Sequence, residues 1–255
     1  MKSLISSLMA LSLLVFAAGC SDDSSSPVTT GRLKMYMTDA PLAGIEKVNI
    51  TFSTIEAHIN GTWIAVNGAP VTIDLLEWNN GSAMLIGDKE LGAGTYTQIR
   101  LMVSKAEVVV DGVTKPLTIP SGDETGLKLT HNFDIVAGTT VELVLDFDVA
   151  KSITVTGNGE YKLKPTIRVV AKAATGAIKG KVSNPLEVPV VTVSQGGTVI
   201  ASAIADPLTG EFVAGFLPAG SYDVEIRNAL NLSAAKTGVV VTVGAVTDIG
   251  TLELK

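Results

Sequence analysis

Several residue types are scarce in this 255-residue chain, and each scarcity narrows what the protein can be. The chain has one cysteine, so it cannot form a disulfide within itself. Charged residues make up 17% and aromatic residues 5%, whereas hydrophobic residues reach 46%. A composition this apolar argues against disorder and supplies enough material for a folded core.

Basic and catalytic residues are also few. The net charge is −6 and no stripe of lysine or arginine is present, which argues against nucleic acid as a partner. The sequence contains no metalloprotease, esterase or phosphate-loop motif. Its two histidines, His58 and His131, have no candidate nucleophile nearby, so we expect ordinary residues of a sheet. These absences predict a protein that is not an enzyme.

The first twenty residues have the pattern of an export signal. Lys2 precedes an apolar run, Leu4 to Ala18, that is too short to span a membrane as a helix. The run ends in Phe16-Ala17-Ala18-Gly19-Cys20, which resembles the lipobox of bacterial lipoproteins, although that family usually has Leu or Val where Ala17 stands. The resemblance implies cleavage after residue 19 and a diacylglycerol joined to Cys20 by a thioether. Ordinary secretion with a chance cysteine is the alternative.

The segment after the cysteine predicts a tether. Residues 1–19 are then the signal peptide, and the polar residues 20–30 form a lipidated, flexible link. Ser21 resembles the default signal for sorting lipoproteins to the outer membrane. We therefore expect a cell-envelope protein, anchored to the outer membrane by its lipid and facing the periplasm or the cell surface. Its partners would be that membrane and an unidentified protein or glycan.

Residues 31–172 have the alternation of β-strands. Leu33, Met35 and Met37, for example, alternate with polar neighbours, and turn residues such as those at 79–81, 111–112 and 158–159 separate the runs. This pattern indicates an antiparallel sandwich or barrel. Only residues 75–86 are a candidate for a short helix.

Five motifs within this segment resemble one bacterial family in order and spacing. They are Thr38-Asp39-Ala40-Pro41, Thr72-Ile73-Asp74-Leu75-Leu76, residues 94–101 (GTYTQIRL), Leu145-Asp146-Phe147-Asp148 and Leu163-Lys164-Pro165. The family is the domain of unknown function 4382. Because that family has no agreed activity, the resemblance implies location and architecture more than a reaction.

Residues 176–255 predict a second, smaller β domain with seven short strands. The motifs Thr209-Gly210-Glu211-Phe212 and 217–224 (LPAGSYDV) resemble carboxypeptidase-regulatory-like, or prealbumin-like, domains, which are accessory sandwiches without catalytic machinery. Both segments also contain a similar run, at 91–96 and 217–222, in which a glycine precedes a tyrosine that we expect to start a strand. The predicted fold is therefore all-β, with two antiparallel β-sandwich domains of immunoglobulin-like or prealbumin-like type.

The acidic residues suggest one specific chemistry. Asp146 and Asp148 share one face of a predicted strand, and Asp39 at another strand end is a possible third oxygen donor. Three such oxygens would suit Ca²⁺ in an exported acidic protein. The alternative is a solvated acidic face, or turn hydrogen bonds from Asp39, and we expect no other cofactor.

Three functions follow from these features. The preferred one is a non-enzymatic cell-envelope lipoprotein that acts as a binding or structural, adhesive module. The alternatives are an envelope hydrolase or processing enzyme that uses Asp39, Asp74, Asp146 and Asp148, and a calcium-stabilised adhesin. Trp63 and Trp78 are further candidates for a carbohydrate or peptide platform, although a tryptophan in a sandwich more often fills the core.

Overall fold

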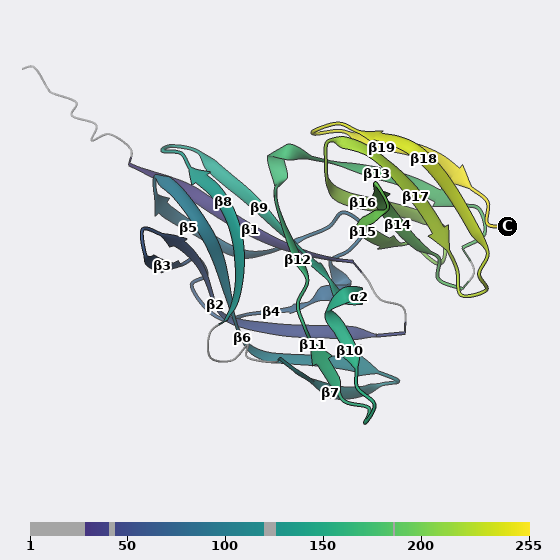
Figure 1. Cartoon of the computed structure of the whole chain (residues 1–255), viewed down its shortest axis with the longest axis horizontal. Helices are drawn as coiled ribbons and strands as arrows, with labels where there is room; N and C mark the ends of the chain where they lie inside the picture. Colours follow the sequence, from purple (N-terminus) through teal and green to yellow (C-terminus); the bar gives the residue numbers. More distant parts are fainter. Residues whose placement is uncertain (1–28, 41–43, 120–125, 186) are drawn as a thin grey trace, which may run out of the picture.

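Two β-sandwiches follow one another along the chain in the computed structural model (Figure 1). The structure describes residues 29–40, 44–119, 126–185 and 187–255, so the expected signal peptide and Cys20 lie outside the described residues. Within the described ranges, no helix is both long and apolar enough to cross a membrane. The fold class is all-β, as the alternating sequence predicts.

The first sandwich packs a four-stranded sheet, β12-β9-β1-β5, on an eight-stranded sheet, β10-β11-β7-β6-β2-β3, in which β4 also pairs with β2 and β8 with β6. Its strands are β1 (Thr30–Ala40), β2 (Lys47–Ile59), β3 (Thr62–Ala65), β4 (Val71–Asp74), β5 (Met84–Gly92), β6 (Gly94–Val110), β7 (Val113–Thr118), β8 (Leu127–Ile135), β9 (Thr140–Asp148), β10 (Ile153–Val155), β11 (Tyr161–Leu163) and β12 (Ile167–Ala171). Three short helical turns complete it: η1 (Leu75–Glu77), α2 (Val149–Ser152) and η2 (Lys172–Ala174).

The second sandwich packs a three-stranded sheet, β16-β13-β19, on a four-stranded sheet, β15-β14-β17-β18. Its strands are β13 (Thr175–Val182), β14 (Val190–Gln195), β15 (Thr198–Ile204), β16 (Glu211–Pro218), β17 (Gly220–Arg227), β18 (Ser233–Val241) and β19 (Val246–Leu252). The predicted number of seven strands is confirmed.

The two sandwiches share one strand order. In each, the first strand (β1 or β13) lies between an antiparallel strand (β5 or β16) and a parallel strand near the end of the domain (β9 or β19). The opposite sheets correspond as well, because β3-β2-β6-β8 matches β15-β14-β17-β18. The first domain is therefore the same seven-stranded sandwich with β4, β7, β10, β11 and β12 added. The pairs β1–β9, β11–β7 and β13–β19 are parallel, a departure from the expected antiparallel pairing.

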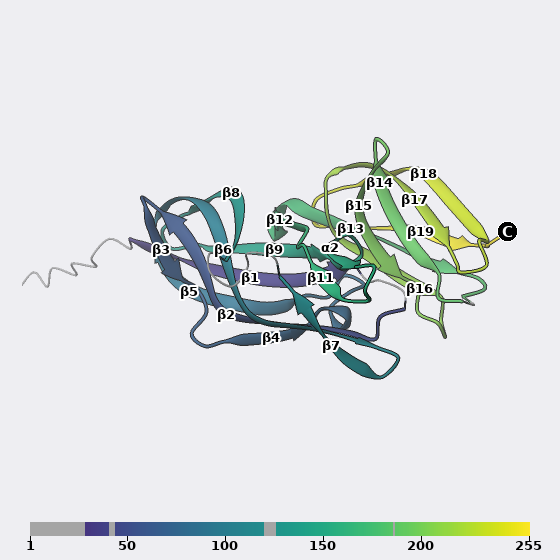
Figure 2. The ribbon, with the colours of Figure 1, turned by 60° about the horizontal axis from the view of Figure 1, so that its bottom comes forward.

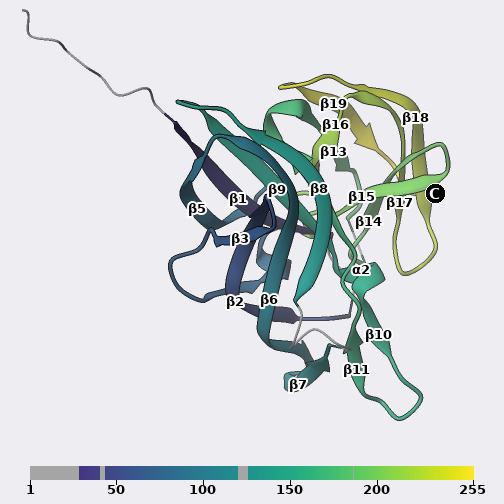
Figure 3. The same cartoon turned by 60° about the vertical axis from the view of Figure 1, so that its left-hand side comes forward.

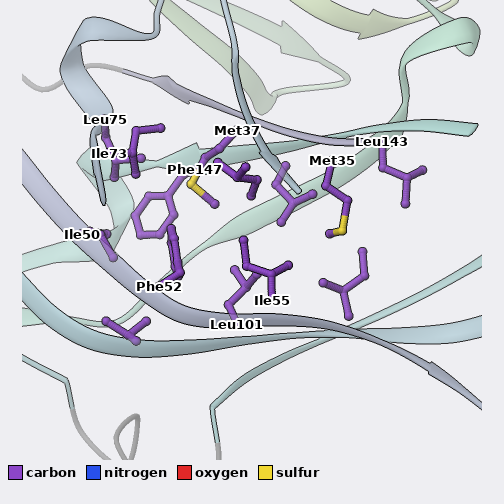
Figure 4. Packing of buried hydrophobic residues seen from close by; sticks show 14 of the residues in the cluster. Met35, Met37, Ile50, Phe52, Ile55, Ile73, Leu75, Leu101, Leu143 and Phe147 are labelled. Carbon is purple, nitrogen blue, oxygen red and sulfur yellow. The ribbon is translucent and has the colours of Figure 1, made fainter. Parts of the chain in front are cut away.

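The core of each sandwich lies between its two sheets. In the first, Met35 and Phe147 of the smaller sheet face Phe52 and Leu101 of the larger one, and all four are fully buried (Figure 4). Each such side chain contributes about 2 kcal/mol through removal from water. A separate buried cluster, from Ile178 to Leu254, fills the second sandwich, so the predicted limits at 172 and 176 fall between two cores.

The run shared by the two domains has the same structure in both. The hydroxyl of Tyr96 donates to the carbonyl oxygen of Gly92 at 3.1 Å, and the hydroxyl of Tyr222 donates to that of Pro218 at 2.8 Å. Both rings are buried where one sheet passes to the other. This arrangement is the tyrosine corner of immunoglobulin-like sandwiches, and it explains why the same motif recurs.

Turn residues behave as the sequence predicts, whereas the candidate helix does not. Asn80 and Asp111 adopt positive φ angles of 52°, each followed by a glycine with positive φ. Of the expected helix at 75–86, only the single turn η1 forms. Asp74 caps it by accepting a hydrogen bond from Leu76 N at 3.2 Å.

Candidate functional site at the domain junction

The predicted site residues gather where the first sandwich meets the second. β1 and β9 run in parallel toward the second domain, so their carboxyl ends lie side by side at the junction (Figures 2 and 3). Thr38 pairs with Asp146 in this register, and Ala40 pairs with Asp148. The sequence alone could not place these ends against another domain.

Asp146 forms an ion pair within the first sandwich, and its partner Arg168 also contacts the second. Its Oδ2 accepts hydrogen bonds from Arg168 Nη2 at 2.5 Å and from Arg168 Nε at 3.2 Å. The remaining Nη1 of Arg168 donates to the carbonyl oxygen of Phe216, in the second sandwich, at 3.2 Å. Burial raises the pKa of the Asp146 carboxyl, and the Arg168 guanidinium opposes that rise. Asp146 thus orients a guanidinium whose remaining nitrogen holds the second domain through the Phe216 carbonyl.

The alternative interpretation, a solvated acidic face, is wrong for Asp146. Asp146 is only 9% exposed, and Val144 on the same face of β9 is fully buried. A narrow gap lined by Thr38, Asp146, Ser202 and Phe216 shows that the second sandwich covers this face. Strand parity correctly predicted which way Asp146 points, but it carries no information about a domain that folds back over it.

The other carboxylates have structural partners of their own. Asp148 caps α2 by accepting from Lys151 N at 3.0 Å, and it also pairs with Lys151 Nζ at 2.7 Å. Asp39 Oδ1 accepts from Val149 N at 3.2 Å. In the register of β1 and β9, Asp39 pairs with Phe147, whereas Asp146 pairs with the preceding residue, Thr38. In the part of the chain that the structure describes, no three acidic, histidine or cysteine side chains form a group that could hold a metal.

The turn at residues 79–81 makes the second contact between the domains. Asn80 Nδ2 donates to the carbonyl oxygen of Ile204 at 3.0 Å, and Asn80 Oδ1 accepts from Val213 N at 3.5 Å. Ile204 and Val213 belong to β15 and β16, which are edge strands of the two sheets of the second sandwich. The neighbouring backbones are also close, because a Cβ atom on Gly215 would lie 2.8 Å from the Cα of Gly81.

A strained residue completes the junction. Phe216 has a φ of 55°, which is rare for a bulky side chain. It lies at an irregularity in the β13–β16 pairing, between the partners of Gly176 and Ile178. The irregularity directs the Phe216 carbonyl toward Arg168. Sequence reasoning missed Arg168, Asn80 and Phe216, and only the turn signal at Asn80 was available to find any of them.

The remaining candidates lie elsewhere. Burial lowers the pKa of His131, beside Phe133 in the first sandwich. His58 lies on the outer face of β2, where its Nδ1 is 3.0 Å from Thr97 Oγ1. Both tryptophans are partly exposed: Trp78 packs against the core, and Trp63 lies beside His58.

Adding calcium tests directly whether Asp146 and Asp148 bind a metal ion or only stabilise the fold. We expect millimolar Ca²⁺ to leave the melting temperature unchanged, because Asp146 and Asp148 already have cationic partners. We also expect Asp146→Asn with Asp148→Asn to lower the melting temperature equally with Ca²⁺ and with chelator. Differential scanning calorimetry measures both effects. A Ca²⁺-dependent rise that disappears in the double variant would restore the metal site.

The fold and the junction define an all-β protein of two sandwich domains joined by a polar contact. Residues 30–165, more than half of the chain, match the family described as "Domain of unknown function (DUF4382)". The chain belongs to this family. A comparison with curated proteins finds no match.

Several solved structures show a distant likeness. The Bacillus anthracis TIE protein is 11% identical with a TM-score of 0.26, and the match covers 89% of this chain and 51% of that one. The major pilin subunit BcpA of Bacillus cereus is 10% identical with a TM-score of 0.23, with 89% and 70% covered. A fimbrial protein from Bacteroides ovatus is 10% identical with a TM-score of 0.23, with 88% and 50% covered. The chain thus spans about half the length of the TIE protein chain, and likenesses this distant define no function.

Proposed function

We propose that the protein is a non-enzymatic lipoprotein of the cell envelope that holds its second sandwich at a fixed position beyond the first. The bridge from Asp146 through Arg168 to the Phe216 carbonyl is the observation that carries this proposal. A charged contact with several hydrogen bonds restrains the two domains, which would otherwise move independently about a short link. The module is then a spacer that presents a binding or adhesive surface.

The position of the first strand supports the same role. β1 begins at the end of the first sandwich that is remote from the second and runs toward the junction (Figures 1 and 2). A lipid on Cys20 would be separated from Thr30 by only nine residues, 21–29. The anchor would therefore place the first sandwich near the outer membrane and the second, accessory sandwich of prealbumin-like type farther away.

The carboxylates favour a structural role over a hydrolase. An acid–base pair needs two side chains that reach one substrate. Asp146 is engaged by Arg168 and Asp148 caps α2. Asp74, the fourth candidate, accepts from Val48 N at 3.1 Å and caps η1. Asp146 lines one small cavity with Asp148 and another with Asp39, but each carboxylate is engaged by hydrogen bonds or ion pairs that stabilise the fold.

The anchor itself is tested by labelling cells with a fatty-acid analogue. We expect the wild type to carry the label and to partition with membranes, because Cys20 supplies the thiol for acylation. Cys20→Ser should lose the label and release the protein, whereas Ser21→Ala, as a matched control, should keep both. Unchanged membrane partition of Cys20→Ser would contradict the lipoprotein proposal.

A further inference from the structure

An aromatic side chain lies on the outer face of the larger sheet of the first sandwich. Trp63 stands on β3, next to β2, and is partly exposed; Trp78 is also partly exposed, but it packs against the core. The guanidinium carbon of Arg100, which comes from β6 on the far side of β2, lies 4.3 Å from the centroid of the Trp63 ring. The indole therefore reaches across β2.

The polar neighbours of this ring are held in place. Arg100 Nε donates to Glu56 Oε2 at 2.5 Å. The imidazole of His58 lies 4.8 Å from Trp63 between ring centroids, tilted by 51°, and its Nδ1 is 3.0 Å from Thr97 Oγ1. Cross-strand pairs of this kind stabilise a sheet, and that contribution exists here as well. Their fixed orientations also make the group rigid before any ligand arrives.

Further polar residues extend the group into a strip across four strands. Gln98 on β6 pairs with His58 on one side and with Thr130 of β8 on the other. In the next row, Lys128 of β8 pairs with Arg100. We call the residues Glu56, His58, Trp63, Gln98, Arg100, Lys128 and Thr130 the tryptophan strip. The strip combines one aromatic surface with planar side chains that donate and accept hydrogen bonds.

We propose that the tryptophan strip binds an uncharged, β-1,4-linked glycan chain. The apolar C–H face of a pyranose stacks on an indole, and pairs of hydroxyl groups match planar groups such as those of Gln98, His58 and Arg100. Glu56 and Arg100 neutralise each other, and the Lys128 ammonium on the neighbouring strand can donate hydrogen bonds to hydroxyl oxygens. A β-1,4-linked chain is an extended ribbon, and its shape fits a flat row of strands.

This inference deepens the binding role proposed above and is independent of the lipid anchor. If Cys20 were not acylated, glycan binding by the strip would be unaffected. If the strip bound no glycan, the anchored spacer would remain. The two proposals therefore fail in different experiments.

Fluorescence titration tests the strip directly, because the chain has two tryptophans and Trp78→Phe leaves Trp63 as the only one. The full chain with Trp78→Phe, purified in detergent, is titrated with cellohexaose, chitohexaose and, as an α-linked control, maltohexaose. We expect a saturable change in Trp63 emission with at least one β-linked hexasaccharide and none with maltohexaose. Absence of any change with both β-linked ligands, or an equal change with maltohexaose, overturns the proposal.

Calorimetric titration of variants then separates binding from sheet stability. We expect Trp63→Ala to weaken binding by about tenfold or more. Gln98→Ala should weaken it by a few fold, and Trp63→Phe should retain part of it. Thr51→Ala, which removes a hydroxyl pair with Thr72 elsewhere on β2 and β4, is the matched control and should bind normally. If Trp63→Ala lowers the melting temperature but binds the glycan like the wild type, the strip is only structural.

Discussion

Replacing Arg168 with methionine is expected to destabilise the protein by about 3 kcal/mol at neutral pH. The change keeps much of the side-chain volume but leaves the Asp146 carboxylate buried without its cation. It also removes the donor to the Phe216 carbonyl, so the contact between the sandwiches is weakened as well. The cost comes from the charge that remains, because breaking one side of a buried pair is worse than removing both.

The loss should depend on pH in a defined direction. Burial raises the pKa of Asp146 above its ordinary value of 3.8, so the folded state binds this proton more tightly than the unfolded state does. A raised folded pKa contributes stability at low pH, and that contribution is lost as the pH rises through the folded pKa. Without Arg168, which lowers the pKa, the rise should be larger. The Arg168→Met defect should therefore be greatest at neutral pH and shrink as acid protonates Asp146.

Urea unfolding at several pH values measures this effect. Arg227→Met is a matched control, because Arg227 pairs with Glu225 at 2.6 Å and both side chains are 52% exposed. A surface pair of this kind contributes less than about 1 kcal/mol. Equal losses for the two variants, or a defect of Arg168→Met that grows toward low pH, would contradict the bridging role of Asp146 and Arg168.

Replacing Gly210 with alanine is expected to unfold the second sandwich while the first stays folded. Gly210 has a φ of 76°, and a Cβ atom there would lie 2.1 Å from the carbonyl oxygen of Val182. The Gly210 carbonyl also accepts a hydrogen bond from Val182 N at 2.8 Å, so the two segments cannot separate without losing it. We expect a loss of about 3 kcal/mol or more, from the backbone clash together with the left-handed conformation.

Gly196 is the matched control for this change. It also has positive φ, at 57°, but a Cβ atom would meet nothing within 4 Å. Gly196→Ala should therefore cost only about 1 kcal/mol. Circular dichroism and two-dimensional NMR distinguish the outcomes, and they also test the predicted boundary between 172 and 176. If Gly210→Ala unfolds the whole chain in one step, the two sandwiches are a single cooperative unit.

Local patterns in the sequence predict most of each sandwich. The alternation at Leu33, Met35 and Met37 places these side chains in the core, and all three are fully buried. The repeated tyrosine motif correctly indicates a related corner in both domains. Strand direction was not predictable, because alternation is identical in parallel and antiparallel pairs. The parallel pairing of β1 with β9 joins segments about a hundred residues apart and leaves no local signal.

The junction could be predicted only in part. The sequence identified Asp146 as an outward-facing carboxylate and Asn80 as a turn residue. The partner of Asp146 depends on how β12 pairs with β9, since Arg168 lies 22 residues beyond it. The partner of Asn80 depends on how the second domain docks, since Ile204 lies 124 residues beyond it. The two tryptophans show the same limit. Their residue type is identical, and only the tertiary structure places Trp78 on the core and Trp63 on the outer face.

The position of Asn80 has a consequence for how the chain folds and stays soluble. Its amide covers backbone groups on β15 and β16, the two strand edges that the second sandwich turns toward the first. Uncovered edges recruit strands from other molecules and lead to aggregation. During synthesis the first sandwich emerges before β15 and β16, so Asn80 is already in place when these two edges form. Reversing the order of the two domains would expose the edges to neighbouring chains before any cover was made.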